Sequence, residues 1–197
     1  MPIRLAVCVS GRGSNLFALL DALAGSRDAE VVLVLSDRAT APALARARER
    51  GLEVECLSNP ADAGEWLSYL RGAEVDLVVL AGFLKLVPPA VVAAYRGRIM
   101  NIHPALLPSF GGPGMYGRRV HQAVIDSGAT ESGATVHLVD EEYDRGQILA
   151  QARVPVRPDD TPETLAARVL EAEHRLLPAV VLHAVKSGRP APVPDSE

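Results

Sequence analysis

The sequence predicts an α/β fold with a mainly parallel, doubly wound sheet and helices on both faces. Short apolar segments in the first half of the chain have the length and composition of buried strands, and helical patterns separate them. The segments are apolar throughout rather than at alternate positions, which is typical of parallel strands covered on both sides. Strands that alternate with helices in this way form repeated βαβ units.

The elements of the first half follow from these patterns. Gly51 is expected to end one helix as its C-terminal cap, and Pro88 with Pro89 is expected to open another. The expected strands are residues 3–9, 31–35, 52–57, 75–80 and 98–102, and the expected helices are residues 16–23, 41–50, 63–70 and 89–95.

The pattern changes after Pro108. Thr161 followed by Pro162 predicts the start of a long helix that continues to about Lys186. We expect a single catalytic domain over residues 1–187 and a frayed, proline-rich tail over 188–197. The other expected elements are a mobile glycine-rich loop at 110–119, a helix at 120–127, and later strands at 135–139 and 148–156 that are antiparallel to part of the sheet.

Composition excludes several classes of protein. A net charge of −4 and a pI of about 5.8 leave no basic footprint for nucleic acid, and no apolar run approaches the roughly 18 residues of a membrane span. Cys8 and Cys56 lie in apolar stretches without metal-ligand spacing, which predicts buried free thiols and no metal. Because the first residues lead directly into an apolar strand-like run, we expect no secretory leader. We therefore expect a cytoplasmic monomer or homodimer with small-molecule substrates and no nucleic-acid or membrane partner.

The stretch from Met100 to Phe110 contains the first candidate site. Asn101 and His103 lie at the end of an expected strand and are two residues apart, so their side chains share one face. An amide that can donate to an oxyanion beside an imidazole that can move a proton suits acyl transfer. The alternative is that both groups satisfy a turn at the strand end.

The loop from Ser10 to Asn15 is the second candidate. A glycine-rich turn between a strand and a helix directs backbone N–H groups at an anion, most often a phosphate. The dinucleotide fingerprint fails, because Leu16 stands where its third glycine is required. This leaves a monophosphate or sugar-phosphate site, or a purely structural tight turn.

Three blocks together resemble a known family. Ser-Gly-Arg-Gly-Ser-Asn at 10–15, Leu-Ala-Gly-Phe at 80–83 and Asn-Ile-His-Pro-Ala-Leu-Leu-Pro at 101–108 resemble the folate-dependent phosphoribosylglycinamide formyltransferases. The resemblance extends to about Lys186. It implies a Rossmann-like formyltransferase fold and transfer of a formyl group from 10-formyltetrahydrofolate to the amine of glycinamide ribonucleotide, a step of purine biosynthesis. Related RNA-modifying formyltransferases add a basic C-terminal domain, which this acidic chain is not expected to have.

The resemblance also implies roles for individual residues. The catalytic residues would be Asn101, His103 and Asp144, and Asp144 is chosen among its acidic neighbours by its spacing from His137 and by Gly146 after it. The ribonucleotide would bind Gly11, Arg12, Gly13, Ser14, Asn15 and Glu173, and the folate would bind Leu84, Lys85, Leu86, Val87, Asn101, Val139, Asp140 and Glu141.

Each of these assignments has an ordinary structural alternative. The acidic run around Asp144 can be a solvated loop, Glu173 an exposed helix glutamate, residues 84–87 part of the core, and His137 either a support for the site or a core histidine. We expect Asp144 to hold the imidazole of His103 and to raise its pKa. His103 can then act as acid, base or both.

Two departures from the family pattern concern substrate contacts. Leu170 replaces a Lys or Gln that helps to hold the phosphate in many members, and an Arg common near Gly64 is absent. We hypothesise that residues 110–119 close over the substrates and that Arg118 or Arg119 supplies the missing phosphate contact. Two other functions stay open: a 10-formyltetrahydrofolate hydrolase, and a non-catalytic nucleotide- or folate-binding module on the same fold.

Overall fold

A computed structural model of the chain describes residues 1–194. The chain divides into two compact units, the first from Met1 to Asn101 and the second from Ile102 onward. The boundary falls inside strand β5 (Ile99–His103). Of the tail expected at 188–197, residues 188–194 lie in the second unit, and residues 195–197 are outside the described part of the chain.

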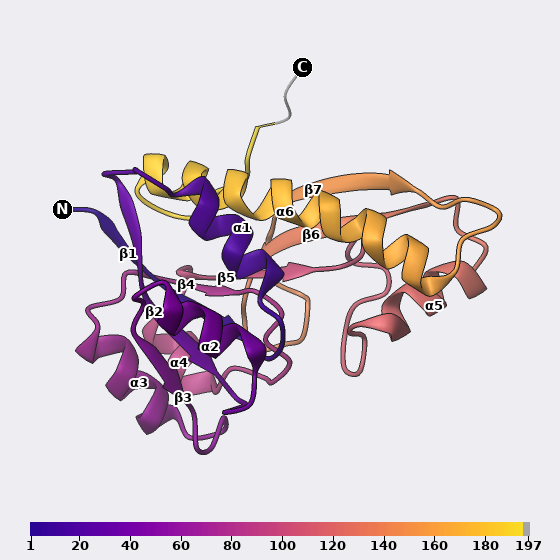
Figure 1. The fold of residues 1–197 in the computed structure, drawn as a ribbon. Coiled ribbons are helices and arrows are strands. Elements are labelled where there is room, and N and C mark those ends of the chain that lie inside the picture. The colour runs from indigo at the N-terminus through magenta and orange to yellow at the C-terminus, as the bar shows by residue number, and fades with distance from the viewer. Residues whose placement is uncertain (195–197) are drawn as a thin grey trace. The chain divides into compact units, whose positions relative to one another are not determined.

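The first unit contains a parallel sheet. Its strands are β1 (Ile3–Val9), β2 (Ala29–Ser36), β3 (Val54–Cys56), β4 (Leu77–Leu80) and the first part of β5, in the order β3-β2-β1-β4-β5 (Figure 1). Each neighbouring pair is parallel. The chain winds outward from β1 in both directions, which confirms the doubly wound fold class. Leu5 to Val9 are fully buried, as expected for a central parallel strand.

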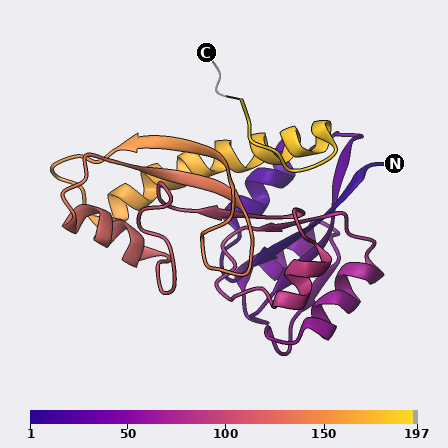
Figure 2. The ribbon, with the colours of Figure 1, turned by 180° about the vertical axis from the view of Figure 1, so that it is seen from behind.

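Four helices connect these strands: α1 (Ser14–Ala22), α2 (Pro42–Glu49), α3 (Ala63–Gly72) and α4 (Pro89–Ala94). Because parallel connections are right-handed, α1 and α2 cover one face and α3 and α4 the other. Helices α3 and α4 pack against each other (Figure 2). The predicted helix ends are confirmed at two places. Gly51 has a positive φ of 77° after α2, and Pro89 is the first residue of α4.

The two cysteines, both in the first unit, differ in environment. Cys8 on β1 is completely buried, and burial raises the pKa of its thiol far above the ordinary value. Cys56 ends β3 and is only partly buried. Both are free thiols, as predicted, but the expectation that both are buried holds only for Cys8.

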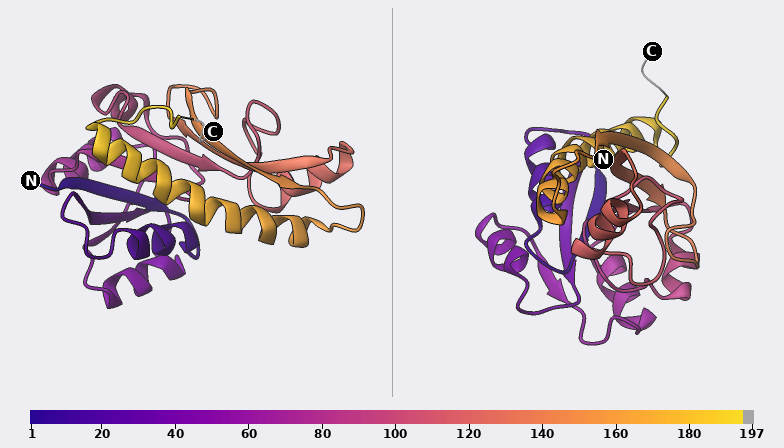
Figure 3. Two further views of the ribbon diagram at one scale, coloured as in Figure 1. Left: turned by 90° about the horizontal axis from the view of Figure 1, so that it is seen from above. Right: turned by 90° about the vertical axis from the view of Figure 1, so that its right-hand side faces the viewer.

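The second unit is a hairpin covered by helices. Strands β6 (Glu131–Leu138) and β7 (Ile148–Pro155) are antiparallel, as predicted, and Thr135 faces Gln151 across the pair. Helix α6 (Pro162–Ser187) packs along this hairpin, and α5 (Arg118–Asp126) lies beside α6 (Figure 3).

Helix α6 begins with a reciprocal capping box. The Thr161 hydroxyl accepts the Thr164 N–H, and the Thr164 hydroxyl accepts the Thr161 N–H, while Pro162 occupies the first helical position. One face of the helix supplies the apolar core of the unit, namely Leu165, Val169, Ala172, Leu177, Val180 and Val181. Across the residues that the structure describes, no helix has both the length and the apolar character needed to cross a bilayer.

Candidate active site

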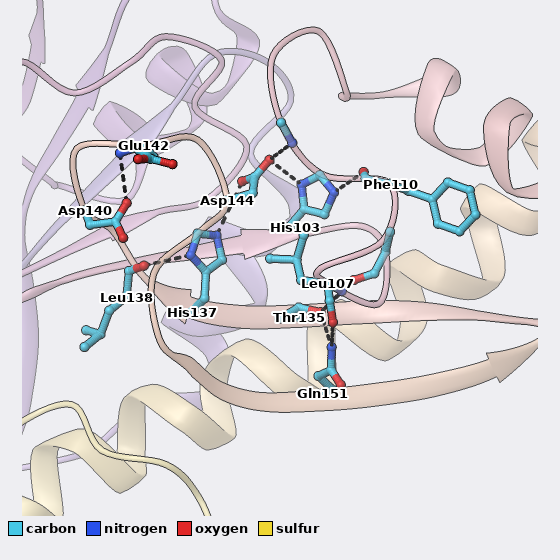
Figure 4. A network of polar contacts seen from close by, with 12 residues as sticks. His103, Leu107, Phe110, Thr135, His137, Leu138, Asp140, Glu142, Asp144 and Gln151 are labelled. Carbon is cyan, nitrogen blue, oxygen red and sulfur yellow. Dashed lines mark hydrogen bonds and ion pairs between the residues drawn. The ribbon is translucent and has the colours of Figure 1, made fainter.

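His103 is the last residue of β5, and its side chain is buried. Its Nε2 atom lies 2.8 Å from the Phe110 carbonyl oxygen, and its Nδ1 atom lies 3.6 Å from Oδ2 of Asp144 (Figure 4). A carbonyl can only accept a hydrogen bond, so Nε2 must carry a proton. A second proton, on Nδ1, would face the carboxylate.

Asp144 lies in the turn between β6 and β7, and the shape of this turn depends on glycine. A Cβ at Gly146 would overlap the Leu138 carbonyl oxygen, so only glycine allows the turn to close against the end of β6. Asp144 itself has a positive φ of 56°. Its side chain is only 10% exposed, whereas Glu141 and Glu142 are exposed. The solvated-loop alternative therefore fits the neighbours of Asp144 but not Asp144.

The Asp144 carboxylate lies between two imidazoles (Figure 4). Oδ2 accepts the Gly112 N–H at 2.9 Å, and Oδ1 lies 3.5 Å from Nε2 of His137. The other ring nitrogen of His137, Nδ1, donates to the Leu138 carbonyl at 2.7 Å. His137 is thus held by its own strand and contacts Asp144, which favours the supporting role over that of an isolated core histidine.

The pKa of His103 is lowered from its ordinary value. Burial is the largest cause and His137 adds to it, while the Asp144 charge and the Phe110 carbonyl act in the opposite direction. The expectation that the pKa of His103 is raised is therefore wrong, because desolvation outweighs the carboxylate. For Asp144, burial raises the pKa, but His137, the charge of His103 and the Gly112 N–H together lower it, so Asp144 is ionised.

Other predicted residues lie in the second unit. Glu173 on α6 is buried, which excludes the alternative of an ordinary exposed helix glutamate. Val139 and Asp140 are half-buried in the turn after β6. Arg118 forms an ion pair with Glu163 at 2.6 Å, and the Arg119 guanidinium lies 5.8 Å from the Tyr116 ring centroid. Neither arginine is therefore without a partner, and a phosphate contact from either stays a prediction.

The glycine-rich loop lies in the first unit. Gly13 has a positive φ of 71°, and a Cβ there would approach the Ala43 Cβ to 2.6 Å. Ser14 and Asn15 already belong to the first turn of α1, which has no side-chain N-cap. Gly11 and Arg12 are exposed. The turn is thus tight for structural reasons, and it also leads directly into a helix N-terminus.

Two further predicted segments belong to the first unit. Leu84 is half-buried, and its N–H donates to the Ser10 hydroxyl at 2.9 Å. Leu86 is 41% exposed and Lys85 is exposed, whereas Val87 is buried, so residues 84–87 are not uniformly core. Asn101 is half-buried and pairs with Leu80 of β4 in the parallel register.

Sequence reasoning missed four groups around His103 and Asp144. Two are backbone groups, the Phe110 carbonyl and the Gly112 N–H, which leave no signal in the residue types. The other two are Thr135 and Gln151, which bond to the loop that follows β5. Strand alternation places Thr135 on the same face as His137 and could have identified it. In the described part of the chain, no three His, Cys, Asp or Glu side chains cluster as metal ligands.

Comparison with known proteins identifies the family to which the chain belongs. The family model described as formyl transferase matches residues 3–181, and the chain belongs to this family. A chloroplastic phosphoribosylglycinamide formyltransferase of Arabidopsis thaliana is 47% identical over 90% of this chain, which spans 64% of that relative's length. The Haemophilus influenzae protein of the same name is 37% identical, with 90% of this chain and 85% of that protein covered.

A solved structure gives the same result for the fold. The phosphoribosylglycinamide formyltransferase of Anaplasma phagocytophilum superimposes with a TM-score of 0.88 at 37% identity, covering 95% of this chain and 88% of that one. The predicted fold class and family resemblance are thereby confirmed.

Proposed function

We propose that this protein transfers the formyl group of 10-formyltetrahydrofolate to the amine of glycinamide ribonucleotide, a step of purine biosynthesis. The observation that carries the proposal is the buried His103 beside the ionised Asp144, in a chain of the formyl transferase family. Relatives that share 37–47% of its residues are named for this activity. A non-catalytic binding module has no need of such a pair.

The chemistry starts with attack of the neutral amine on the formyl carbon. The tetrahedral intermediate carries O⁻ on that carbon and a positive charge on the incoming nitrogen. The amide of Asn101 donates to the oxyanion, and one such donor is worth roughly 10²–10³ in rate. Asn101 and His103 are alternate residues of β5, so both act from the same side of the strand.

His103 moves the proton in this proposal. With its pKa lowered, the imidazole is largely neutral near pH 7. Because Nε2 already carries the proton donated to the Phe110 carbonyl, the proton of the attacking nitrogen goes to Nδ1, the atom that faces Asp144. Asp144 stabilises the imidazolium that results, and the proton then passes to N10 of the departing folate. General acid–base catalysis of this kind contributes roughly 10²–10⁴-fold.

The substrate contacts are also proposals. The N-terminus of α1, with residues 11–15, would hold the phosphoribosyl end through its backbone N–H groups. The carboxylate of Glu173 would bond the ribose hydroxyls, and residues 84–87 and 139–141 would receive the folate. A cytoplasmic location and a monomeric or dimeric state stay predictions. The Arabidopsis relative is described as chloroplastic.

A folate absorbance assay tests the proposal. Purified protein is mixed with 10-formyltetrahydrofolate, with and without glycinamide ribonucleotide, beside a His103→Ala variant. We expect turnover that requires the ribonucleotide and is largely lost in the variant. Equal turnover without the ribonucleotide would indicate a hydrolase instead, and binding of both ligands without turnover would indicate a binding module.

A further inference from the structure

The loop that follows β5, residues 104–112, supplies two backbone groups to the His103–Asp144 pair. The Phe110 carbonyl accepts from Nε2 of His103, and the Gly112 N–H donates to Asp144. These contacts set the proton-bearing nitrogen of His103 and hold one oxygen of the carboxylate. The path of this loop therefore decides the geometry of the pair.

Two side chains of the β6–β7 hairpin fasten the start of the loop (Figure 4). The Thr135 hydroxyl donates to the Ala105 carbonyl at 2.7 Å and accepts the Leu107 N–H at 3.0 Å. Nε2 of Gln151 donates to the Leu107 carbonyl and to the Thr135 hydroxyl, each at 2.9 Å. Thr135 and Gln151 are cross-strand partners, so both project from the same face of the hairpin.

The network uses every donor and acceptor of the Thr135 hydroxyl. Its one proton goes to Ala105, and its two lone pairs accept from Leu107 and Gln151. Because that proton is already used and the Leu107 carbonyl can only accept, the group of Gln151 at this place must be the NH₂. Neither an apolar side chain nor a carboxylate can replace it. Thr135 is fully buried, so a broken network would leave unsatisfied polar groups away from water.

We propose that Gln151, acting with Thr135, is a positioning residue for His103: it fixes the loop after β5 so that Phe110 and Gly112 reach the catalytic pair. Gln151 touches neither His103 nor the reacting atoms in this account. Its effect on turnover rests on the proposed function, whereas its effect on the imidazole does not.

The imidazole gives a direct readout. The charged or titratable groups that act on His103 are Asp144 and His137 on the hairpin side and His121 on α5. A change at Gln151 leaves these residues in the chain but releases the Phe110 carbonyl from His103. The hydrogen bond to this carbonyl is one of the interactions that raise the pKa of His103. Loss of the network should therefore lower this pKa further.

The test compares Gln151→Met and Thr135→Val with two controls. Arg153 lies on β7 like Gln151, and Arg153→Met removes its ion pair with Glu131 of β6 without touching the loop. Thr135→Ser keeps the hydroxyl. His103 is titrated by imidazole NMR without substrates, and kcat and KM are measured with both substrates. We expect a lower His103 pKa and a kcat reduced roughly 10- to 100-fold at similar KM in the first two variants, and near wild-type values in the controls.

Both readouts must change together. An unchanged titration or an unchanged kcat in the folded Gln151→Met protein overturns the positioning role. If Gln151→Met does not fold, the pair Thr135→Val and Thr135→Ser decides by the same criteria. If the wild-type protein has no formyltransferase activity, the proposed function fails, and the titration alone decides the role of Gln151.

Discussion

The carboxylate of Asp144 opposes the effect of burial on His103. Asp144→Asn removes a charge that raises the pKa of His103, so the His103-dependent limb of the pH–rate profile should move to lower pH. The imidazolium also loses its stabilising partner, and kcat should fall by at least roughly 10²-fold. Steady-state kinetics across pH 5–9 measure both effects, with the exposed neighbour variant Glu142→Gln as control. An unchanged profile and kcat would refute the assignment of Asp144.

Gly146 holds the turn of Asp144 through a close approach that no other residue permits. Gly146→Ala would force its Cβ against the Leu138 carbonyl, so the turn must open. We expect a loss of about 1–3 kcal/mol in unfolding free energy, together with reduced turnover. Urea denaturation measures the first effect. Gly72→Ala is the matched control, because no atom lies within 4 Å of a Cβ at that position, and its stability should equal or exceed that of the wild type.

At the scale of elements, the start of α6 depends on its capping box. Thr161→Ala removes the acceptor for the Thr164 N–H and should lower the unfolding free energy by about 1 kcal/mol. Thr161→Ser keeps the oxygen and should retain most of the stability. Urea midpoints of the three proteins provide the comparison. Equal midpoints for the Ala and Ser variants would mean that tertiary packing alone fixes the start of the helix.

Strand and helix order was predictable because it depends on local patterns. Apolar runs indicated the strands, and Gly51, Pro89 and Thr161 with Pro162 marked helix ends. Helix α6 nevertheless continues through Pro178, where proline chemistry alone predicts a break. Packing of one long apolar face along the hairpin overrides that local preference, as tertiary contacts often do.

Parts of the site could not be predicted because they depend on burial and on backbone contacts, which residue types do not reveal. His103 was a candidate from its place beside Asn101 at a strand end, and a family resemblance added Asp144; the structure brings the two side chains together. The sign of the pKa shift of His103 was not predictable, because it depends on the balance between burial and a carboxylate at 3.6 Å. The contacts from Phe110 and Gly112 involve only backbone atoms, which any residue carries.

At the scale of the whole molecule, buried histidines couple folding to pH. Burial lowers the pKa of His103, His121 and His174 below their ordinary value of 6.5. As pH falls below about 6.5, the unfolded chain therefore takes up protons that the folded chain does not, and stability decreases. Above that pH these histidines are uncharged in both the folded and the unfolded chain, so they do not reduce the stability. Urea midpoints between pH 7.5 and 5 should fall with acidification, and a rise over this interval would contradict the prediction.

The completely buried thiol of Cys8 can report when the central strand of the first unit becomes exposed to solvent. Cys8 has no exposed surface and a strongly raised pKa, while Cys56 is partly exposed. A thiol-reactive dye should therefore label one cysteine per native molecule quickly and the second only when the sheet opens. The ratio of the slow rate to the rate in denaturant measures the free energy of that opening. Comparing it with the global unfolding free energy shows whether the first unit opens alone or only with the entire chain.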